Sequence, residues 1–448
     1  MHKILIIIMF FFFFRGLAQD TITYSYVNEK TYDYYLKGEW KSVCKLGMKG
    51  IKNDIDYYYL RARLGKSFFE RGNYMAAARH FRKALKQNSA DPFSMEYLYY
   101  SLINTGDLRE AAVLRSNMSN ELADYMKLNK KQPFIDDFLF EFATCSNKDF
   151  EEQSVINLEN FPIGSKKNLT DNYLNLTILA RHPLWKRVDY THAITHLSLN
   201  GLEQSRPTGT PPFTPPPYIE DEQTVSQNQY FGNINFHISR KDDFSVGTHL
   251  LTSKTSITRG GRGNYGNIMS RENNGVVFVN YLRSFSVFKA NLFLAKGNIN
   301  LDKQYQGTAT LYYFPFGNLN LYGSTEITGI SENDTTNKII WQQMAGFRAM
   351  KNTWLEFSYM SGDIKNYLDK GGLIVYNNTN TITSKAEGTI MVSFPKSHIR
   401  VYFKYFYITS KGDNFYSSIN DANPTDYSNL NATKYHLQTI TGGLLWNF

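Results

Sequence analysis

The sequence is poor in three features that define common protein classes. Only two of its 448 residues are cysteines, Cys44 and Cys145, and their spacing does not decide between one bridge and two free buried thiols. Beyond Ala18, no run approaches the roughly 20 apolar residues that a membrane-spanning helix needs. Lys and Arg are interspersed with Asp and Glu, so no basic run accompanies the formal net charge of +9. Nucleic acid is therefore not a predicted partner, and the charge favours anionic surfaces such as lipopolysaccharide.

The beginning of the chain has the pattern of a secretory signal peptide. Lys3 precedes an unbroken apolar run from Ile4 to Phe14, and Gly16-Leu17-Ala18 places small residues before a cleavage site ahead of Gln19. The run is too short for a stable membrane anchor. We expect the segment 1–18 to be removed on export, which puts both cysteines where disulfides can form.

Aromatic residues are abundant, by contrast, and they suit a membrane β-barrel. Phe, Tyr and Trp make up 15% of the chain without any apolar block, and barrels carry aromatic girdles at both membrane interfaces. The end of the chain alternates in polarity, as a strand between lipid and lumen does. Its apolar face holds Ile440, Gly442, Leu444, Trp446 and Phe448, and its polar face holds Thr439, Thr441 and Asn447.

A helical repeat precedes the barrel. Gly38, Gly72 and Gly106 recur at equal intervals in similar contexts (GEWKSV, GNYMAA, GDLREA). The interval equals the tetratricopeptide period of about 34 residues. We expect a helical domain over residues 19–147, closed by a helix near 120–147, that either binds a partner in its groove or acts as a spacer. The predicted packing residues are Leu64, Gly65, Phe68, Gly72, Tyr74, Ala77, Phe81, Ala84, Gly106 and Ala111.

From residue 188 onward, segments of alternating polarity are joined by connections that are in turn short and long. This is typical of an outer-membrane barrel, which has short periplasmic turns and long external loops. We expect twelve antiparallel strands over residues 188–448, with residues 148–187 as linker and start of the barrel. The alternative is fourteen strands, if residues 173–180 belong to the barrel together with another strand near 155–161. The fold class is thus α + β, an α-solenoid followed by a barrel.

The polar faces of these strands must point into a lumen. The predicted lumen-facing charges either line a permeation path or hold a substrate, or they simply fill a narrow interior with paired groups. These residues are His237, Lys289, Glu326, Glu356, Glu387, Arg400 and Lys404.

No catalytic, cofactor-binding or metal-ligating residue is predicted. His192 and His196 lie four apart on one strand, roughly 13 Å from each other, which is too far to share an ion. The glycines of residues 260–266 lack the strand-to-helix context of a phosphate loop, and the prolines of 207–217 suit an external loop. We therefore expect no enzyme, with a lipid-processing hydrolase as the alternative.

The combined architecture resembles two groups of proteins. A signal peptide, a tetratricopeptide array and a carboxy-terminal barrel are similar to the YaiO-type outer-membrane barrels and to the exporters of poly-N-acetylglucosamine and cellulose. Leu444, Trp446 and Phe448 also resemble the signal that the barrel-assembly machinery reads at the last strand. The resemblance implies a Gram-negative outer membrane with the repeats in the periplasm. This chain departs from the exporters in having fewer repeats and a smaller barrel, which favours a narrower or closed lumen.

These features together predict a component that exports or assembles a polymer or protein at the cell surface. The repeats would bind an unidentified periplasmic protein or peptide, and the barrel would contact outer-membrane lipid and lipopolysaccharide. A non-conducting anchor for protein–protein interaction and a small-solute porin are the alternatives.

Overall fold

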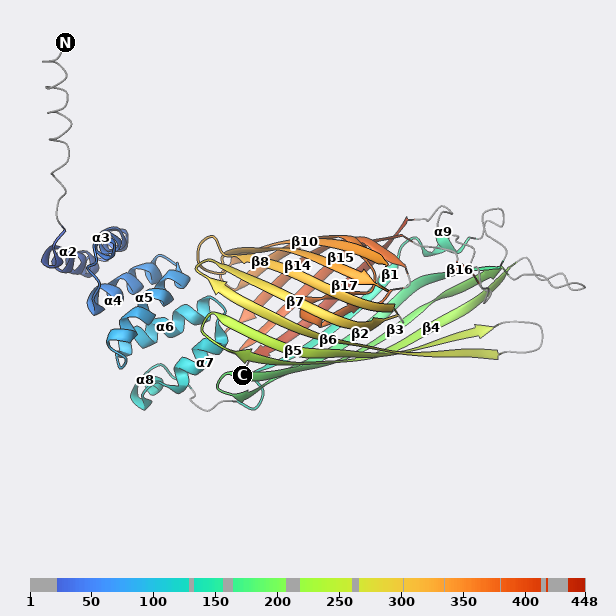
Figure 1. Ribbon diagram of the computed structural model, residues 1–448, viewed down its shortest axis with the longest axis horizontal. Coiled ribbons are helices and arrows are strands. Elements are labelled where there is room, and N and C mark those ends of the chain that lie inside the picture. Colours follow the sequence, from blue (N-terminus) through green and yellow to red (C-terminus); the bar gives the residue numbers. More distant parts are fainter. Residues whose placement is uncertain are drawn as a thin grey trace, which may run out of the picture. The chain divides into compact units, whose positions relative to one another are not determined.

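The computed structural model describes residues 22–128, 133–155, 164–206, 218–259, 266–300, 302–333, 335–378, 380–411, 416–417 and 434–447. The expected signal peptide, the proline-rich segment 207–217 and Phe448 lie outside these ranges. The chain forms two compact units, residues 1–130 and 131–448 (Figure 1). Among the described residues, no helix is both long and apolar enough to cross a bilayer.

The described part of the first unit is helical and consists of helix pairs. Gly38, Gly72 and Gly106 follow the first helices of three pairs with φ of 69°, 73° and 75°, which only glycine adopts without strain. Asn73 and Asp91 cap the helices that follow them by accepting hydrogen bonds from backbone N–H groups. The helices are α2 (Tyr24–Leu36), α3 (Trp40–Lys52), α4 (Tyr58–Glu70), α5 (Tyr74–Gln87), α6 (Pro92–Asn104), α7 (Leu108–Ser116) and α8 (Asn120–Tyr125).

Small residues let these helices approach closely. A Cβ added at Gly65 would lie only 2.7 Å from the Phe81 ring, so this position requires glycine. Leu64, Ala77, Phe81 and Ala84 are all fully buried. Phe68 is partly buried against the clusters on both sides of α4. In the next pair, Ala111 is 1% exposed and packs on Leu98 and Leu102 of α6.

The helical unit ends earlier than expected. The helix expected near 120–147 is wrong: α8 ends at Tyr125, and residues 137–147 form strand β1 (Asp137–Asn147). The reason lies in the period of the side chains. Phe140 and Phe142 are exposed on one face and Ala143 and Cys145 are buried on the other, which is a period of two and not of 3.6.

The second unit is a closed antiparallel barrel of fourteen strands, so the alternative of fourteen is confirmed and the expected twelve is wrong. β1 closes the sheet by pairing with both β17 and β2. It supplies the additional strand that the alternative places near 155–161, a segment that lies largely outside the described ranges. The other strands are β2 (Ser165–Trp185), β3 (Val188–Arg206), β4 (Ile219–His237), β5 (Asp242–Arg259), β6 (Gly266–Phe285), β7 (Phe288–Ile299), β8 (Asp302–Tyr313), β9 (Leu321–Glu332), β10 (Thr336–Met350), β11 (Thr353–Ile364), β14 (Thr381–Phe394), β15 (Ile399–Lys411) and β17 (Lys434–Asn447).

One end of the barrel carries only short connections, as expected from the sequence. These are residues 186–187, 238–241, 286–287, 314–320, 351–352 and 395–398. Asp137 pairs with Asn447, whose N–H donates to the carbonyl of His398 at 2.9 Å. The chain therefore enters and leaves the barrel at this short-turn end.

Strands β2 to β6 are longer than the sequence pattern indicates. They contain 18 to 21 residues, whereas the other barrel strands contain 11 to 15. Their ends extend past the opposite rim as a sheet (Figure 1). The sequence pattern predicts a long loop over residues 201–227, but segments 201–206 and 219–227 are strand. Their buried side chains include polar ones such as Glu203, Gln204 and Asp221, so the apolar alternation that indicates a strand is missing there. The short helix α9 (Phe150–Ser154) packs against β2, and the short strand β16 (Tyr416–Ser417) pairs with β2.

The outer and inner faces of the wall differ sharply. Outward side chains are large and apolar on every strand, as Leu292, Phe357 and Phe403 illustrate with exposed fractions of 57%, 55% and 49%. Inward positions include buried threonines such as Thr328 and Thr439. The barrel therefore has an apolar exterior and a polar interior, the reverse of a water-soluble sheet with a single buried face.

The connection between β11 and β14 folds into the barrel. It contains β12 (Tyr367–Asp369), the 3-10 turn η2 (Lys370–Gly372) and β13 (Ile374–Tyr376), and the two strands form a sheet of their own. We call residues 365–378 the inner hairpin. The sequence pattern predicts a long external loop over residues 362–382. That prediction is wrong for the inner hairpin, because its side chains are buried among inward-facing residues of the wall.

Candidate functional site: a cavity closed by an inner hairpin

The inner hairpin has two apolar faces. Tyr367 pairs with Tyr376, and Leu368 pairs with Val375, so the first pair lies on one face of the ladder and the second pair on the other. Positive φ values at Gly371 and Gly372, 67° and 87°, turn the chain between them. Because both faces are apolar, such a hairpin is stable only where protein covers both sides.

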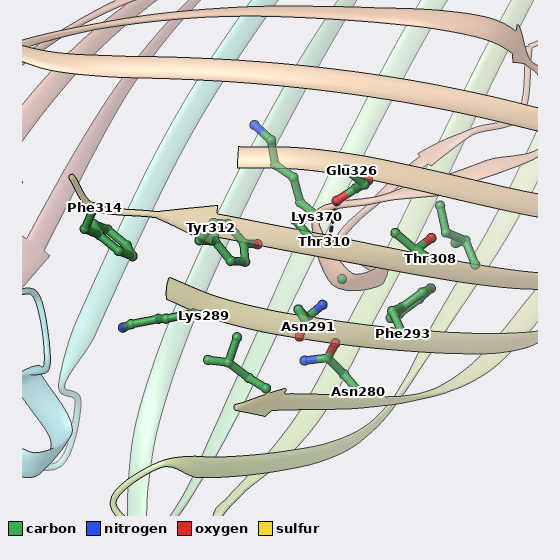
Figure 2. Close-up of a pocket in the computed structure, with 13 residues that line it drawn as sticks. Asn280, Lys289, Asn291, Phe293, Thr308, Thr310, Tyr312, Phe314, Glu326 and Lys370 are labelled. Carbon is green, nitrogen blue, oxygen red and sulfur yellow. Dashed lines mark hydrogen bonds between the residues drawn. The ribbon is translucent and has the colours of Figure 1, made fainter. Parts of the chain in front are cut away.

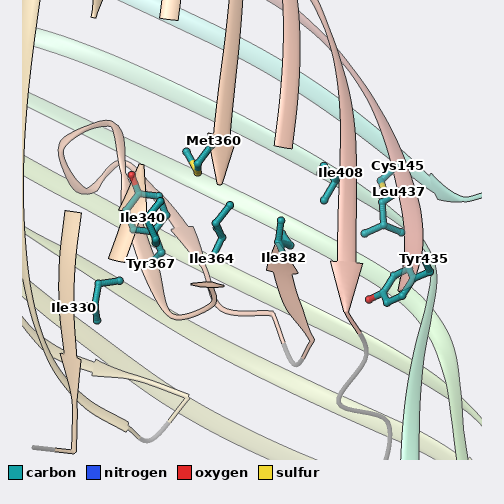
Figure 3. Close-up of a cluster of buried hydrophobic side chains, with 10 residues drawn as sticks. All are labelled: Cys145, Ile330, Ile340, Met360, Ile364, Tyr367, Ile382, Ile408, Tyr435 and Leu437. Atoms are coloured by element: carbon teal, nitrogen blue, oxygen red, sulfur yellow. The ribbon is translucent and has the colours of Figure 1, made fainter. Parts of the chain in front are cut away.

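The tyrosine face packs on one side of the wall (Figure 3). Tyr367 is fully buried, and its ring stacks on Tyr376 with centroids 5.7 Å apart. The Tyr376 hydroxyl accepts a hydrogen bond from the Lys385 ammonium at 2.7 Å. The surrounding cluster joins β1 to strands between β9 and β17 through Cys145, Ile330, Ile340, Met360, Ile364, Ile382, Ile408, Tyr435 and Leu437.

The opposite face packs on the other side of the wall. Leu368 and Val375 join a cluster in which Phe278 stacks on Phe231, with centroids 5.7 Å apart. A Cβ added at Gly372 would lie 2.9 Å from the Phe278 ring, so the turn itself lies against β6. The cluster also contains Ala193, Leu251, Val276, Phe293, Ala295 and Ile299. The hairpin thus bridges the lumen from one wall to the other.

Hydrogen bonds fix the hairpin tip at several points of the wall. The Gln306 amide accepts from the Leu368 N–H at 3.0 Å and donates to the Leu368 carbonyl at 2.7 Å, so it replaces a strand neighbour. The Tyr367 hydroxyl donates to Glu326 at 3.0 Å. The His249 Nδ1 lies 2.8 Å from the Gly372 carbonyl. Three different strands, β5, β8 and β9, therefore hold these few residues.

Amide side chains fix the base of the hairpin. Asn300 donates to the side chain of Asn366 at 2.8 Å and to the carbonyl of Asn377 at 3.0 Å. Asn377 in turn donates to Gln227 of β4 at 2.7 Å. The side chains of Asn366 and Asn377 are thereby paired, as burial requires.

A cavity of about 440 Å³ lies beside the hairpin tip (Figure 2). Leu368, Lys370 and Gly371 of the hairpin form one side of it, and strands β6 to β9 form the other. Amides, hydroxyls, three aromatic rings, one carboxylate and two ammonium groups line it, which suits a polar ligand of small-molecule size. The wall residues are Asn280, Leu282, Lys289, Asn291, Phe293, Thr308, Thr310, Tyr312, Phe314 and Glu326.

Two of the predicted lumen-facing charges, Lys289 and Glu326, line this cavity. Glu326 accepts a hydrogen bond from Thr310 at 2.8 Å in addition to the one from Tyr367. Lys289 has its ammonium 5.9 Å from the centroid of Phe314.

A second group of predicted charges lies on neighbouring strands. The Lys404 ammonium lies 2.9 Å from Glu141, which also accepts from the Tyr402 hydroxyl at 2.5 Å. Glu387 accepts from Thr389 at 3.2 Å and lies 3.7 Å from the Lys385 ammonium. These carboxylates and cations compensate one another inside the barrel.

The remaining predicted charges lie elsewhere. Glu356 accepts from the Tyr322 hydroxyl at 2.5 Å. His237 lies between two carboxylates near the short-turn end, 2.7 Å from Asp189 and 2.6 Å from Asp243. Arg400 lies in register with Leu445 of β17 at the same end.

Sequence reasoning missed the residues that close the lumen. Tyr367 and Leu368 are not among the predicted residues, because the sequence pattern indicates an external loop at the hairpin. Without the hairpin, nothing in the sequence singles out Gln306 and His249 among the residues of the wall. Two short apolar runs on either side of a glycine pair in YLDKGGLIVY (residues 367–376) are the signal that could have found the hairpin.

His192 and His196 lie on the wall, together with His182. His182 and His192 approach with their Nε2 atoms 3.1 Å apart, and His196 lies 2.9 Å from the Asn228 side chain. Within the described ranges, no three or more His, Cys, Asp or Glu side chains gather as metal ligands.

Fold and site together define a closed fourteen-stranded barrel filled by its own hairpin. No family model and no curated protein matches the sequence. Among solved structures, the toluene transporter TodX of Pseudomonas putida aligns with a TM-score of 0.42 and 7% identity, covering 70% of this chain and 89% of that one. A FadL homologue of Pseudomonas aeruginosa gives 0.41 and 6%, covering 80% and 94%. A bacterial polysaccharide outer membrane secretin gives 0.35 and 8%, covering 69% and 98%.

Proposed function

We propose that this protein is an outer-membrane barrel that is closed at rest by its inner hairpin and anchors a periplasmic tetratricopeptide array. The observation that carries the proposal is the hairpin, which packs on both sides of the wall and is hydrogen-bonded to β4, β5, β8 and β9. A barrel filled in this way does not conduct, so its simplest role is to hold the helical unit at the membrane.

The outer surface supports insertion into a bilayer. Aromatic side chains ring the barrel near the short turns, as Trp185, Phe285, Phe288, Phe394 and Trp446 do with exposed fractions of 42% to 68%. A second set lies toward the other end, namely Trp341, Tyr359, Tyr405 and Tyr407. Aliphatic residues such as Leu292 and Ile390 lie between the two sets. This is the band between girdles that marks the lipid-facing surface of a barrel.

The connections support the orientation. Outer-membrane barrels keep their short turns in the periplasm. Because the chain enters this barrel at the short-turn end, the helices that precede β1 would be periplasmic. Export to this location requires the signal peptide that the sequence predicts ahead of Gln19.

The helical unit supports partner binding. Its three helix pairs follow the equal spacing of the glycines, and the close contact of Gly65 with Phe81 is of the kind by which tetratricopeptide helices interlock. Tyr24, Tyr32 and Tyr59, all on first helices of pairs, are about half exposed. Half-exposed tyrosines are frequent anchors in protein–protein interfaces.

Single-channel recording in a planar bilayer tests the closed state. We expect the full-length protein to insert without open steps, and a variant in which residues 366–377 are replaced by a short Gly-Ser linker to conduct steadily. A variant shortened by residues 261–264 of the β5–β6 connection controls for loop shortening and should remain silent. Stable open steps from the unmodified protein would contradict the proposal and would favour a porin.

Export of a polymer or protein is the second candidate, and the cavity beside the hairpin tip favours it. Lys370 and Gly371 form part of its lining, so movement of the hairpin would enlarge the cavity toward a passage. A cross-link that fixes the hairpin to the wall distinguishes the two roles. If the protein exports, cells with the fixed hairpin would lose a surface polysaccharide or protein, whereas an anchor would function unchanged.

A further inference from the structure

We propose that the outward faces of α3 and α5 bind the anionic phospholipid surface of the leaflet in which the short-turn end of the barrel lies. The inference rests on the proposed membrane location of the barrel and adds a second membrane contact. It concerns a different surface from the tyrosine-bearing helices proposed for partner binding.

Helix α3 carries a lysine stripe. Lys41, Lys45, Lys49 and Lys52 recur at spacings of four, four and three residues, so they lie on one face and span about 16 Å. All four are exposed. The buried residues of α3, Val43, Cys44, Gly47 and Gly50, lie on the opposite face. No residue of this helix is acidic.

Helix α5 repeats this arrangement. Arg79, Lys83 and Lys86 share one exposed face, and the helix buries Ala77, Phe81 and Ala84 on the other. It also contains no Asp or Glu. Both helices pack on α4. Seven exposed cations on two acid-free helices give each helix a face that attracts anions, unlike α2, which carries two acidic residues beside a single lysine.

The barrel itself indicates which anion is available. Its six short connections contain six Lys or Arg and no Asp or Glu, whereas the connections at the other end contain more Asp and Glu than Lys and Arg. The six, Lys186, Arg187, Arg240, Lys241, Lys351 and Lys396, are all exposed and follow directly after the aromatic girdle. Cations that lie just beyond the aromatic girdle of a barrel contact lipid headgroups.

A bilayer fits the helical surface better than an acidic protein does. The cations form an exposed row along each helix, which suits a diffuse layer of headgroup charge. The covalent link to a membrane-inserted barrel also gives the lipid a high effective concentration, so even weak contacts between the helices and the headgroups hold the helices at the membrane. Each basic residue near an anionic surface changes the binding constant about five-fold.

Lysine labelling of the full-length protein in lipid nanodiscs tests the proposal. Acetylation rates of individual lysines would be compared by mass spectrometry in discs of pure phosphatidylcholine and in discs with added phosphatidylglycerol. We expect Lys41, Lys45, Lys49, Lys83 and Lys86 to react at least several-fold more slowly in the anionic discs. Added salt should remove the difference, and Lys37, exposed after α2, is the internal control and should react equally in both.

A variant with Lys41, Lys45, Lys49 and Lys52 replaced by Gln sharpens the test. In anionic discs, its Lys83 and Lys86 should recover most of their reactivity, because four of the seven cations are lost. Equal labelling in the two lipids would overturn the proposal, and so would protection that requires an added acidic polypeptide. Failure of the barrel to co-migrate with discs of either lipid would instead contradict the proposed membrane location, so the two failures are distinguishable.

Discussion

At the scale of single residues, small side chains and paired polar groups decide where this chain packs closely. Gly65 and Gly372 each leave room for an aromatic ring, and Gln306 completes the hydrogen bonds of a buried hairpin backbone. The alternation of side chains along a strand predicts which of them face inward. It does not predict their partners, because Glu141 and Lys404 meet only after the sheet has closed.

His80 makes the helical unit sensitive to acid. Burial, reinforced by the neighbouring Arg61 charge, lowers the pKa of His80 from 6.5 to about 3. The folded state therefore favours neutral histidine, and the unfolded state binds an extra proton below pH 6.5. The free energy of unfolding therefore decreases as the pH falls from 6.5 toward about 3, the two pKa values of His80. The loss is about 2 kcal/mol by pH 5.

Helix content followed by circular dichroism during urea titration would measure this loss in the full-length protein. The His80→Gln variant should lose less stability than the parent over the same pH interval. An identical pH dependence in both proteins would show that His80 is not the responsible group.

At the scale of elements, period-two patterns predict the central strands, and connections are harder to predict. The pattern predicts short connections at 239–243, 350–353 and 395–398, and the structure has them at 238–241, 351–352 and 395–398. Sequence reasoning misses β1 because it directly follows a helical repeat, where a change of period is easily taken for more helix. It misses the inner hairpin because an apolar connection is stable inside a barrel only after the barrel has formed. A local sequence pattern contains no information about the interior of the finished barrel.

The two ends of strand β7 provide a test of the lipid-facing band. Leu292 and Asn298 both point outward, the first within the apolar band and the second beyond it. Leu292→Arg should destabilise the barrel by about 2–4 kcal/mol, because an arginine in the hydrocarbon layer is costly, whereas Asn298→Arg should change little. Urea titration of the barrel in phospholipid vesicles, read as loss of the heat-resistant gel band, measures both. Equal effects of the two substitutions would be inconsistent with a lipid-facing band on β7.

At the scale of the whole molecule, the chain combines a helical unit and a barrel that is filled by its own sequence. The apolar exterior and the basic short turns are typical of a barrel in a membrane. Residues 365–378 occupy the interior. Passage through the lumen would require that segment to move. An anchoring role requires only that it stay.

Cross-linking of the hairpin to the wall measures the central claim most directly. In a background without the native cysteines, Leu368→Cys would be paired with Phe293→Cys, which points inward, or with Leu294→Cys, which points outward. After treatment of membranes with a short thiol-bridging reagent, mass spectrometry should find the joined peptides only for the Phe293 pair. Cross-linking of the Leu294 pair, or of neither, would mean that the hairpin does not lie in the lumen.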